Sequence, residues 1–188
     1  MNRERELAQL ATFSHSTRLV TLLGPAGVGK TRLALEAWPA ALVVELAGAE
    51  GEEGVISAFC RALSIENVGR QATDVIREAL LARAPREVVL DGCDRARPAI
   101  ATFASALLGG SRDLFFVCTS RSALDLPFEQ RFHVEPLLEA DAARLFVDRA
   151  RLVDPSIAID PQDELLRSVL GALGGFPLAI ELDRKSVV

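Results

Sequence analysis

Apolar residues follow two kinds of pattern along this chain of 188 residues. Short, nearly continuous apolar runs predict buried strands at 19–23, 40–46, 87–90 and 114–118, with a short fifth strand near 131–134. Between the runs, apolar residues recur at helical spacing, which predicts helices at 3–12, after 31, at 55–63, at 73–83 and from 98 to the glycine pair 109–110. Strands that alternate with helices indicate a parallel sheet covered on both faces, so the fold class is α/β.

The strand pattern stops beyond residue 136, and helical spacing continues. Ala142, Leu145, Phe146, Ala150 and Val153 give one helix, and Leu165, Leu166, Val169, Leu170 and Leu173 give another. We predict that the second helix has Asp160 as its N-cap and Pro161 as its first residue. The sequence therefore predicts an α/β domain over residues 1–136 and an incomplete helical subdomain over 137–182.

The stretch between the first strand and its helix, Gly24 to Thr31, has the pattern G-x-x-x-x-G-K-T. Its glycines allow positive φ and close approach to an anion, and its N–H groups with the helix N-terminus form a cradle for phosphate. Lys30 would reach the β and γ phosphates, and the Thr31 hydroxyl would ligate Mg²⁺. The alternative is a glycine-rich turn that binds nothing. Motif, strand and helix agree, so the pattern predicts a nucleotide-binding protein.

Three further residues are candidates for the same chemistry. Asp91 ends the strand at 87–91 and would hold Mg²⁺ directly or through water; the alternative is a helix cap. Asp94 is the nearest acid that could orient an attacking water, or it caps the next helix. Arg121, in T-S-R after the fourth strand, lies at the sheet edge where ligands bind and would reach the γ-phosphate. The alternative is a surface arginine paired with a nearby acid.

Composition narrows the classes of function. A formal net charge of −5 argues against direct nucleic-acid binding by this segment. The three cysteines, Cys60, Cys93 and Cys118, have no C-x-x-C spacing, so we expect reduced thiols and neither a disulfide framework nor a zinc site. No apolar run approaches the roughly 20 residues that cross a membrane, and no signal peptide is apparent. We expect a cytoplasmic protein without membrane contact.

Taken together, the motifs resemble those of the STAND ATPases, which include bacterial multidomain transcriptional regulators and the NB-ARC (AP-ATPase-like) switches. The segments that carry the resemblance are G-P-A-G-V-G-K-T-R-L-A, V-V-L-D-G-C-D, C-T-S-R-S-A-L and G-G-F-P-L-A-I-E-L, in that order. The resemblance implies an ASCE-type, AAA+-like P-loop NTPase sheet of five parallel strands, with the fourth between the first and third. It also implies that Arg121 senses phosphate, that Pro177 packs near adenine, and that Arg3 belongs to a segment lining the adenine pocket.

The chain departs from the family pattern in places. Gly92 and Asp94 stand where close relatives have Asn and Glu, and the shorter Asp94 side chain puts efficient hydrolysis in doubt. Relatives continue into a winged helix and sensor repeats and carry a DNA-binding domain, so we expect such partners outside this chain. The resemblance also admits nucleotide-dependent oligomerisation. Residues 183–188 are similar to a translated sequencing-library adapter, and we interpret them as a non-native tail of a truncated fragment.

The sequence thus predicts a regulatory module that binds ATP or ADP with Mg²⁺ and hydrolyses ATP slowly. The alternatives are a module that holds nucleotide without turnover and, less favoured, a P-loop kinase. The residues expected to act in catalysis are Lys30, Asp91, Asp94 and Arg121, with Thr31 and Asp91 on the metal. Those expected to bind the nucleotide are Arg3, Gly24, Pro25, Ala26, Gly27, Val28, Gly29, Lys30, Thr31, Arg32 and Pro177.

Overall fold

The computed structural model describes residues 3–66, 71–83, 86–156 and 159–183. The chain divides into two compact units. The α/β unit comprises Glu4–Gly24 and Lys30–His133, and the helical unit comprises Met1–Arg3, Pro25–Gly29 and Val134–Val188. The domain limits 1–136 and 137–182 stay a prediction. The suggested non-native tail, 183–188, lies outside the described residues except for Asp183.

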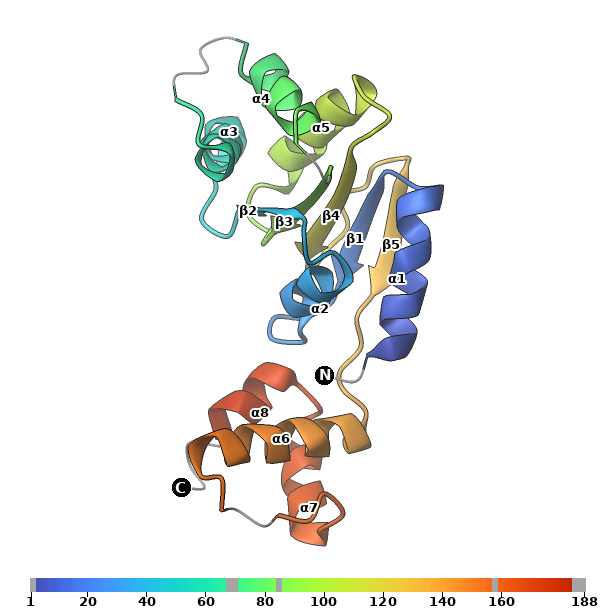
Figure 1. Ribbon diagram of the computed structural model, residues 1–188, viewed down its shortest axis with the longest axis vertical. Helices are drawn as coiled ribbons and strands as arrows, with labels where there is room; N and C mark the ends of the chain where they lie inside the picture. The colour runs from blue at the N-terminus through green and yellow to red at the C-terminus, as the bar shows by residue number, and fades with distance from the viewer. Residues whose placement is uncertain (1–2, 67–70, 84–85, 157–158, 184–188) are drawn as a thin grey trace. The chain divides into compact units, whose positions relative to one another are not determined.

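The α/β unit is built on one parallel sheet of five strands (Figure 1). The strands are β1 (Leu19–Leu23), β2 (Leu42–Glu45), β3 (Glu87–Asp91), β4 (Phe115–Ser120) and β5 (Glu129–His133). Their order is β2-β3-β4-β1-β5, and every pair is parallel. The fourth strand thus lies between the first and third, which confirms the prediction. The carboxyl ends of β1, β3 and β4 therefore meet at one edge of the sheet.

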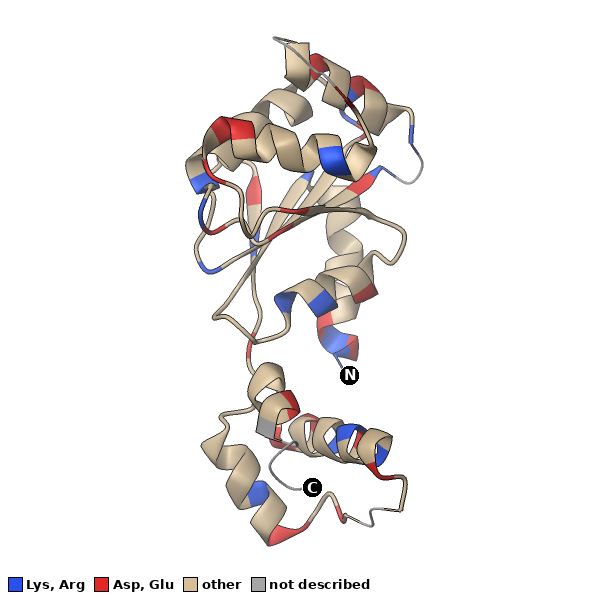
Figure 2. Ribbon diagram, turned by 90° about the vertical axis from the view of Figure 1, so that its left-hand side faces the viewer, with Lys and Arg blue, Asp and Glu red and all other residues tan. Residues whose placement is uncertain are grey.

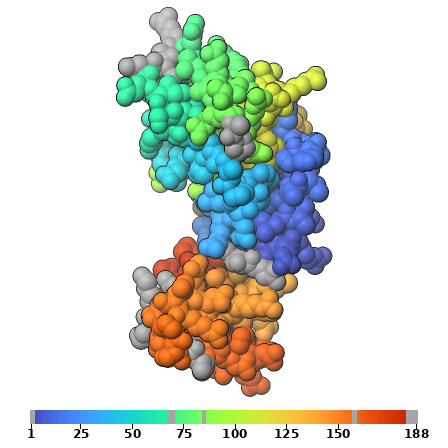
Figure 3. Space-filling view, viewed as in Figure 1, coloured from blue at the N-terminus to red at the C-terminus, as the bar shows by residue number. Residues whose placement is uncertain are grey.

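Helices cover both faces of the sheet. They are α1 (Glu4–Ser16), α2 (Lys30–Ala37), α3 (Gly51–Leu63), α4 (Ala72–Leu81) and α5 (Arg97–Gly109). Helices α3, α4 and α5 share a buried apolar cluster with alternate strand residues such as Val88, Leu90 and Phe116, while α1 and α2 lie on the other side (Figure 1). In the space-filling view the visible surface of the α/β unit is formed largely by helices α1 to α4 (Figure 3). Burial on both faces explains why the strands are apolar almost throughout.

Several predicted bounds in this unit are wrong by a few residues. The first helix runs to Ser16, and β4 runs two residues further than predicted. Helix α3 begins at Gly51, before the predicted start at 55, because Glu52 and Glu53 in its first turn favour a helix N-terminus. Strand β5 begins at Glu129, two residues earlier than predicted, because pairing with β1 fixes its register, Leu19 opposite Glu129.

The helical unit contains α6 (Glu139–Val153), α7 (Glu164–Ala172) and α8 (Pro177–Asp183). Its buried cluster includes Phe146, Leu166, Leu170 and Ile180. Val153 and Leu165, two of the apolar positions from which these helices were predicted, are 51% and 76% exposed.

The predicted start of α7 is also wrong. The N-cap is Asp163, whose carboxylate accepts the N–H groups of Leu165 and Leu166. The Asp160 carboxylate accepts the N–H of Gln162 and so forms a turn before the helix. An aspartate can cap a helix at either position, and the sequence offers two of them three residues apart, Asp160 before Pro161 and Asp163 before Glu164.

Acidic and basic residues are interspersed along the described helices and loops (Figure 2). The three cysteines form no disulfide, and Cys93 and Cys118 are buried. None of the helices in the described ranges is long and apolar enough to cross a membrane.

Candidate functional site

Two segments that are far apart in the sequence meet at the carboxyl edge of the sheet. The Thr31 hydroxyl, in the first turn of α2, donates to Oδ1 of Asp91 at 2.6 Å, across a separation of 60 residues. Thr119 donates to the same Oδ1, also at 2.6 Å. The predicted metal-binding pair Thr31 and Asp91 are therefore in direct contact within the α/β unit.

Lys30 lies beside this pair. Its ammonium donates to the carbonyl of Gly24 at 2.8 Å, which closes the two ends of the loop toward each other. The Gly24 N–H in turn donates to the carbonyl of Ser120 at the end of β4. Partial burial lowers the pKa of Lys30, against the carboxylates of Asp94 and Asp91, which raise it; Arg121 also lowers it. Two acidic residues, Asp91 and Asp94, and two basic residues, Lys30 and Arg121, thus lie near one another at the carboxyl edge of the sheet.

The turn after Asp91 explains the glycine at position 92. Gly92 has φ +81°, and a Cβ added there would lie 3.0 Å from the Cα of Ala47. A side chain at this position would therefore be strained and crowded. The turn directs the Gly92 N–H onto the Thr119 hydroxyl at 2.9 Å.

Asp94 does not cap the following helix, so that alternative is wrong. Helix α5 begins at Arg97 without a side-chain cap. Oδ1 of Asp94 instead accepts the Ser120 hydroxyl at 3.2 Å and the Arg121 N–H at 2.8 Å. Asp94 has turned toward β4 because these donors at the strand end are within reach.

Arg121 pairs with Asp94, through its Nε at 3.4 Å, and its side chain is 65% exposed. Burial raises the pKa of Asp94, but the hydrogen bonds from the Arg121 backbone and side chain, and its charge, outweigh burial. The pKa therefore lies below the ordinary value of 3.8. The two predicted catalytic side chains are thus brought together, in the arrangement of an arginine paired with a nearby acid.

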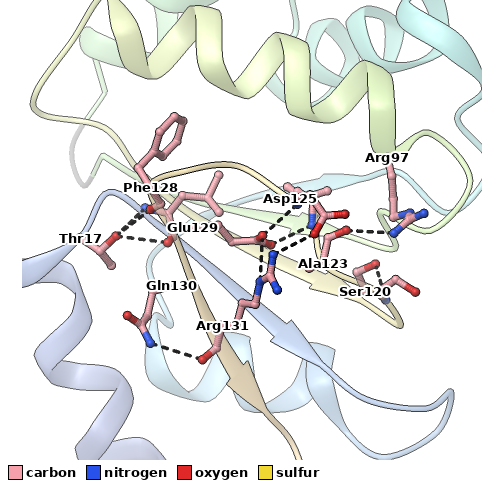
Figure 4. A network of polar contacts seen from close by, with 12 residues as sticks. Thr17, Arg97, Ser120, Ala123, Asp125, Phe128, Glu129, Gln130 and Arg131 are labelled. Carbon is pink, nitrogen blue, oxygen red and sulfur yellow. Dashed lines mark hydrogen bonds and ion pairs between the residues drawn. The ribbon is translucent and has the colours of Figure 1, made fainter.

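The loop that follows Arg121 folds around the buried carboxylate of Glu129 (Figure 4). Glu129 accepts the N–H groups of Leu124 and Asp125 at 2.8 and 3.0 Å, and the Arg131 guanidinium lies 3.4 Å away. Arg97, at the start of α5, donates to the carbonyl of Ala123 at 2.9 Å. These contacts fasten the loop that leads away from Arg121 to both β5 and α5.

The remaining predicted residues belong mostly to the helical unit. Arg3 is 3% exposed and donates to the carbonyls of Val28 and Glu135, both at 3.0 Å. The N–H of Leu178 donates to the carbonyl of Gly27, and a Cβ added to Gly29 would lie 3.6 Å from the ring of Pro177.

The loop backbone has the predicted form in part. Gly27 and Gly29 have φ of +79° and +100°, whereas Gly24, at 158°, is close to extended. Val28 is buried. Pro25 and Ala26 are exposed, as is Arg32 in α2 of the other unit.

The donors at the strand edge fit a hard divalent cation. A threonine hydroxyl and a carboxylate in contact are oxygen ligands of the type that Mg²⁺ prefers. No group of three or more His, Cys, Asp or Glu in the described ranges could hold a metal ion alone.

Sequence reasoning missed two residues of this region. Thr119 stands in the T-S-R segment, in which the motif indicates a role for the arginine alone. Glu129 lies in β5, where a strand residue with a charged side chain is usually on the surface. The signal for Thr119 was a hydroxyl at the carboxyl end of a buried strand, next to a charged residue.

Curated relatives match nearly the whole chain. An uncharacterized protein of Mycobacterium tuberculosis is 33% identical over 197 aligned positions, which cover 97% of this chain and 49% of that protein. A putative HTH-type transcriptional regulator of the same organism is 34% identical over 174 positions, which cover 87% of this chain and 20% of the regulator. The chain therefore spans half or less of the length of these relatives. No protein-family model matches the chain.

Solved structures with the same fold include two proteins named as ATPases and Cdc6p. A STAND protein with a tetratricopeptide repeat sensor from Pyrococcus horikoshii superimposes with a TM-score of 0.67 at 20% identity, covering 98% of this chain and 30% of that one. A Walker-type ATPase of Pyrococcus abyssi gives 0.65 at 15% identity, with 97% and 66% coverage. Cdc6p of Pyrobaculum aerophilum gives 0.65 at 19%, with 99% and 62%. The fold that the motifs predicted is thereby confirmed: the chain has the P-loop fold of these ATPases and is homologous to a putative HTH-type transcriptional regulator.

Proposed function

We propose that the chain is the nucleotide-binding module of a regulatory ATPase, which binds ATP or ADP with Mg²⁺ and hydrolyses ATP slowly. The observation that carries the proposal is the 2.6 Å hydrogen bond between the Thr31 hydroxyl and the Asp91 carboxylate. It joins the end of the glycine-rich phosphate-binding motif, which follows β1, to the acid at the end of β3. Strand β4 lies between these two strands. In a turn that bound nothing, we would not expect the threonine hydroxyl to be paired with a carboxylate from another strand.

In this proposal the backbone N–H groups of Gly24 to Thr31 hold the phosphates, and Lys30 supplies positive charge to them. Thr31 and Asp91 would hold Mg²⁺, which when bound neutralises charge on the phosphates. Arg121 would leave Asp94 and contact the γ-phosphate. The placing of Arg3 and Pro177 near the adenine remains a prediction from the resemblance.

Hydrolysis should be slow because Asp94 is poorly suited to activate water. Its carboxylate is occupied by Ser120 and Arg121, and its lowered pKa makes it a weak base. Gly92 offers no second acid beside Asp91. The same observations favour the second candidate function, a module that holds nucleotide without measurable turnover.

The regulatory role rests on the relatives. One is named as a putative HTH-type transcriptional regulator, and a protein of the same fold is named as a signal-transduction ATPase with a repeat sensor. We propose that this module acts as the nucleotide-dependent switch of such a regulator, with winged-helix, sensor and DNA-binding parts supplied by other domains. A switch needs a second element that differs between the ATP and ADP states.

Calorimetry with Mg·ATP and Mg·ADP, followed by a single-turnover hydrolysis assay, tests the proposal. We expect binding by the original chain, loss of binding in Lys30→Ala, and loss of phosphate release in Asp91→Asn. Asp113→Asn is the matched control, because Asp113 is an exposed acid that pairs with Arg86 away from the loop.

The outcomes separate the candidate functions. Absence of binding heat from a folded sample would overturn the proposal. Binding without phosphate release above background would select the nucleotide-holding module. Transfer of phosphate to a small-molecule acceptor instead of water would select the kinase.

A further inference from the structure

Thr119 joins the last residue of β3 and the two that follow it to the end of β4. Its hydroxyl donates to Oδ1 of Asp91 at 2.6 Å and accepts the N–H of Gly92 at 2.9 Å. Its carbonyl accepts the N–H of Cys93 at 2.9 Å. The side chain is 2% exposed, so water does not compete for these bonds. One residue of β4 thus fixes the acid and the turn behind it.

The direction of these hydrogen bonds is determined by their donors. An N–H can only donate, so the Gly92 N–H uses the acceptor capacity of the Thr119 oxygen and leaves the hydroxyl proton for the carboxylate. Thr31 donates to the same carboxylate oxygen. Both hydroxyls therefore converge on Oδ1, and the other oxygen, Oδ2, is left for a metal ion or its bound water.

The two hydroxyls differ in what they can do when nucleotide binds. Thr31 belongs to the phosphate-binding motif, and its oxygen would have to share its lone pairs with the metal. Thr119 lies in β4, a central strand paired on both sides, at β1 and β3. Its position is therefore set by the sheet and does not depend on the nucleotide.

We propose that Thr119 is a positioning residue, which holds the Asp91 carboxylate in the orientation that binds Mg²⁺. The inference rests on the proposed function, because it concerns the metal of that same site. Thr119 acts through Asp91 and touches neither nucleotide nor metal. Partners that orient a metal ligand in this way change metal affinity by about 10- to 100-fold when they are removed.

The coupling between Mg²⁺ and nucleotide measures this role. The affinity for ADP is determined by calorimetry in excess Mg²⁺ and again in EDTA, and the ratio of the two dissociation constants gives the gain due to the metal. We expect Thr119→Val to reduce that gain by about 10- to 100-fold and to leave ADP affinity in EDTA unchanged. Thr119→Ser, which keeps the hydroxyl, should restore most of the gain.

Thr21→Val is the matched control. Thr21 is also fully buried, in β1, opposite Cys118 in the neighbouring strand. Its hydroxyl is buried without a hydrogen-bond partner among the described residues, so Thr21→Val should leave the gain from Mg²⁺ unchanged. If Thr119→Val does not fold, Thr119→Ala removes the same hydroxyl with a smaller side chain and carries the same comparison.

The results distinguish this inference from the proposed function. The inference is overturned if the valine variant keeps the full gain from Mg²⁺, if it weakens ADP binding equally with and without Mg²⁺, or if the serine variant loses as much as the valine variant. If the original chain binds no ADP in either condition, the proposed function itself fails.

Discussion

The α/β unit and the helical unit hold their structures together in different ways. In the α/β unit, continuous apolar strands are covered on both faces, and the polar groups at the strand ends satisfy one another. In the helical unit, the buried cluster is smaller, and Leu138, Leu165 and Leu182 are more than half exposed. The sheet therefore keeps its charged and polar groups in fixed positions, whereas the helices depend more on their individual caps and contacts.

The largest effect is expected from a change in the centre of the sheet. Phe116 in β4 is fully buried and lies 6.4 Å, between ring centroids, from Phe59 of α3. Phe116→Ala should lower the free energy of unfolding by about 3–5 kcal/mol, through lost burial and the cavity that remains. Denaturant unfolding followed by circular dichroism measures the loss.

Phe128 provides the control for this change. It is 36% exposed, in the loop before β5, so Phe128→Ala should cost much less than Phe116→Ala. Equal losses in the two variants would show that the sheet centre is not the main source of stability in the α/β unit.

The second prediction concerns the buried carboxylate that organises the loop after Arg121. Glu129→Gln should cost about 1.5–3 kcal/mol, because the amide group cannot accept both backbone N–H groups and faces one of them with a donor. Asp125→Asn changes an exposed acid that also pairs with Arg131, and it should cost less than about 1 kcal/mol. Chemical denaturation of both variants measures the two losses in the free energy of unfolding. If Glu129→Gln left the free energy of unfolding unchanged, the loop would be held without this charge.

The third prediction concerns the helical unit, whose buried cluster is small and in which Asp163 caps the N-terminus of α7. Asp163→Ala should lower stability by about 0.5–2 kcal/mol, because it leaves the N–H groups of Leu165 and Leu166 without their acceptor. Asp160→Ala serves as the control and should have the smaller effect, since Asp160 accepts only the turn N–H of Gln162. Hydrogen exchange of the α7 amides, compared between the two variants, reports the difference locally. The reverse order would restore Asp160 as the cap.

The sequence was sufficient for those parts of the fold that depend on local pattern. The apolar runs predicted β1 and β3 closely, and the G-x-x-x-x-G-K-T motif located the loop between β1 and α2. The exposed Leu165 was missed because helical spacing does not tell which of two neighbouring leucines meets a core when the core is small. The early start of β5 was missed because its register is set by β1, more than a hundred residues earlier.

The candidate site was predictable residue by residue but not contact by contact. Asp91 and Thr31 could be paired from their motifs, because the carboxyl ends of β1 and β3 lie at the same edge of a parallel sheet. Thr119 and Glu129 could not, because a hydroxyl or carboxylate in a strand does not reveal its partner. Their partners are backbone N–H groups and a carboxylate brought near by the sheet, and only the folded chain shows which of them meet.

The smallest expected effect is the pH dependence that Asp94 contributes. Because its pKa is lower in the folded chain than the ordinary value of 3.8, the folded state binds fewer protons than the unfolded state in acid. Its stabilising contribution is therefore complete above 3.8 and is lost as the pH falls through the lowered pKa. The difference in unfolding free energy between the original chain and Asp94→Asn should thus shrink in acid, and contributions of other carboxylates cancel in it. Arg121→Ala, which removes the side-chain partner and keeps the backbone N–H, should remove only part of this dependence. A difference that stays constant with pH would mean that Arg121 does not hold Asp94 in solution, and the carboxylate would then be free to act on water.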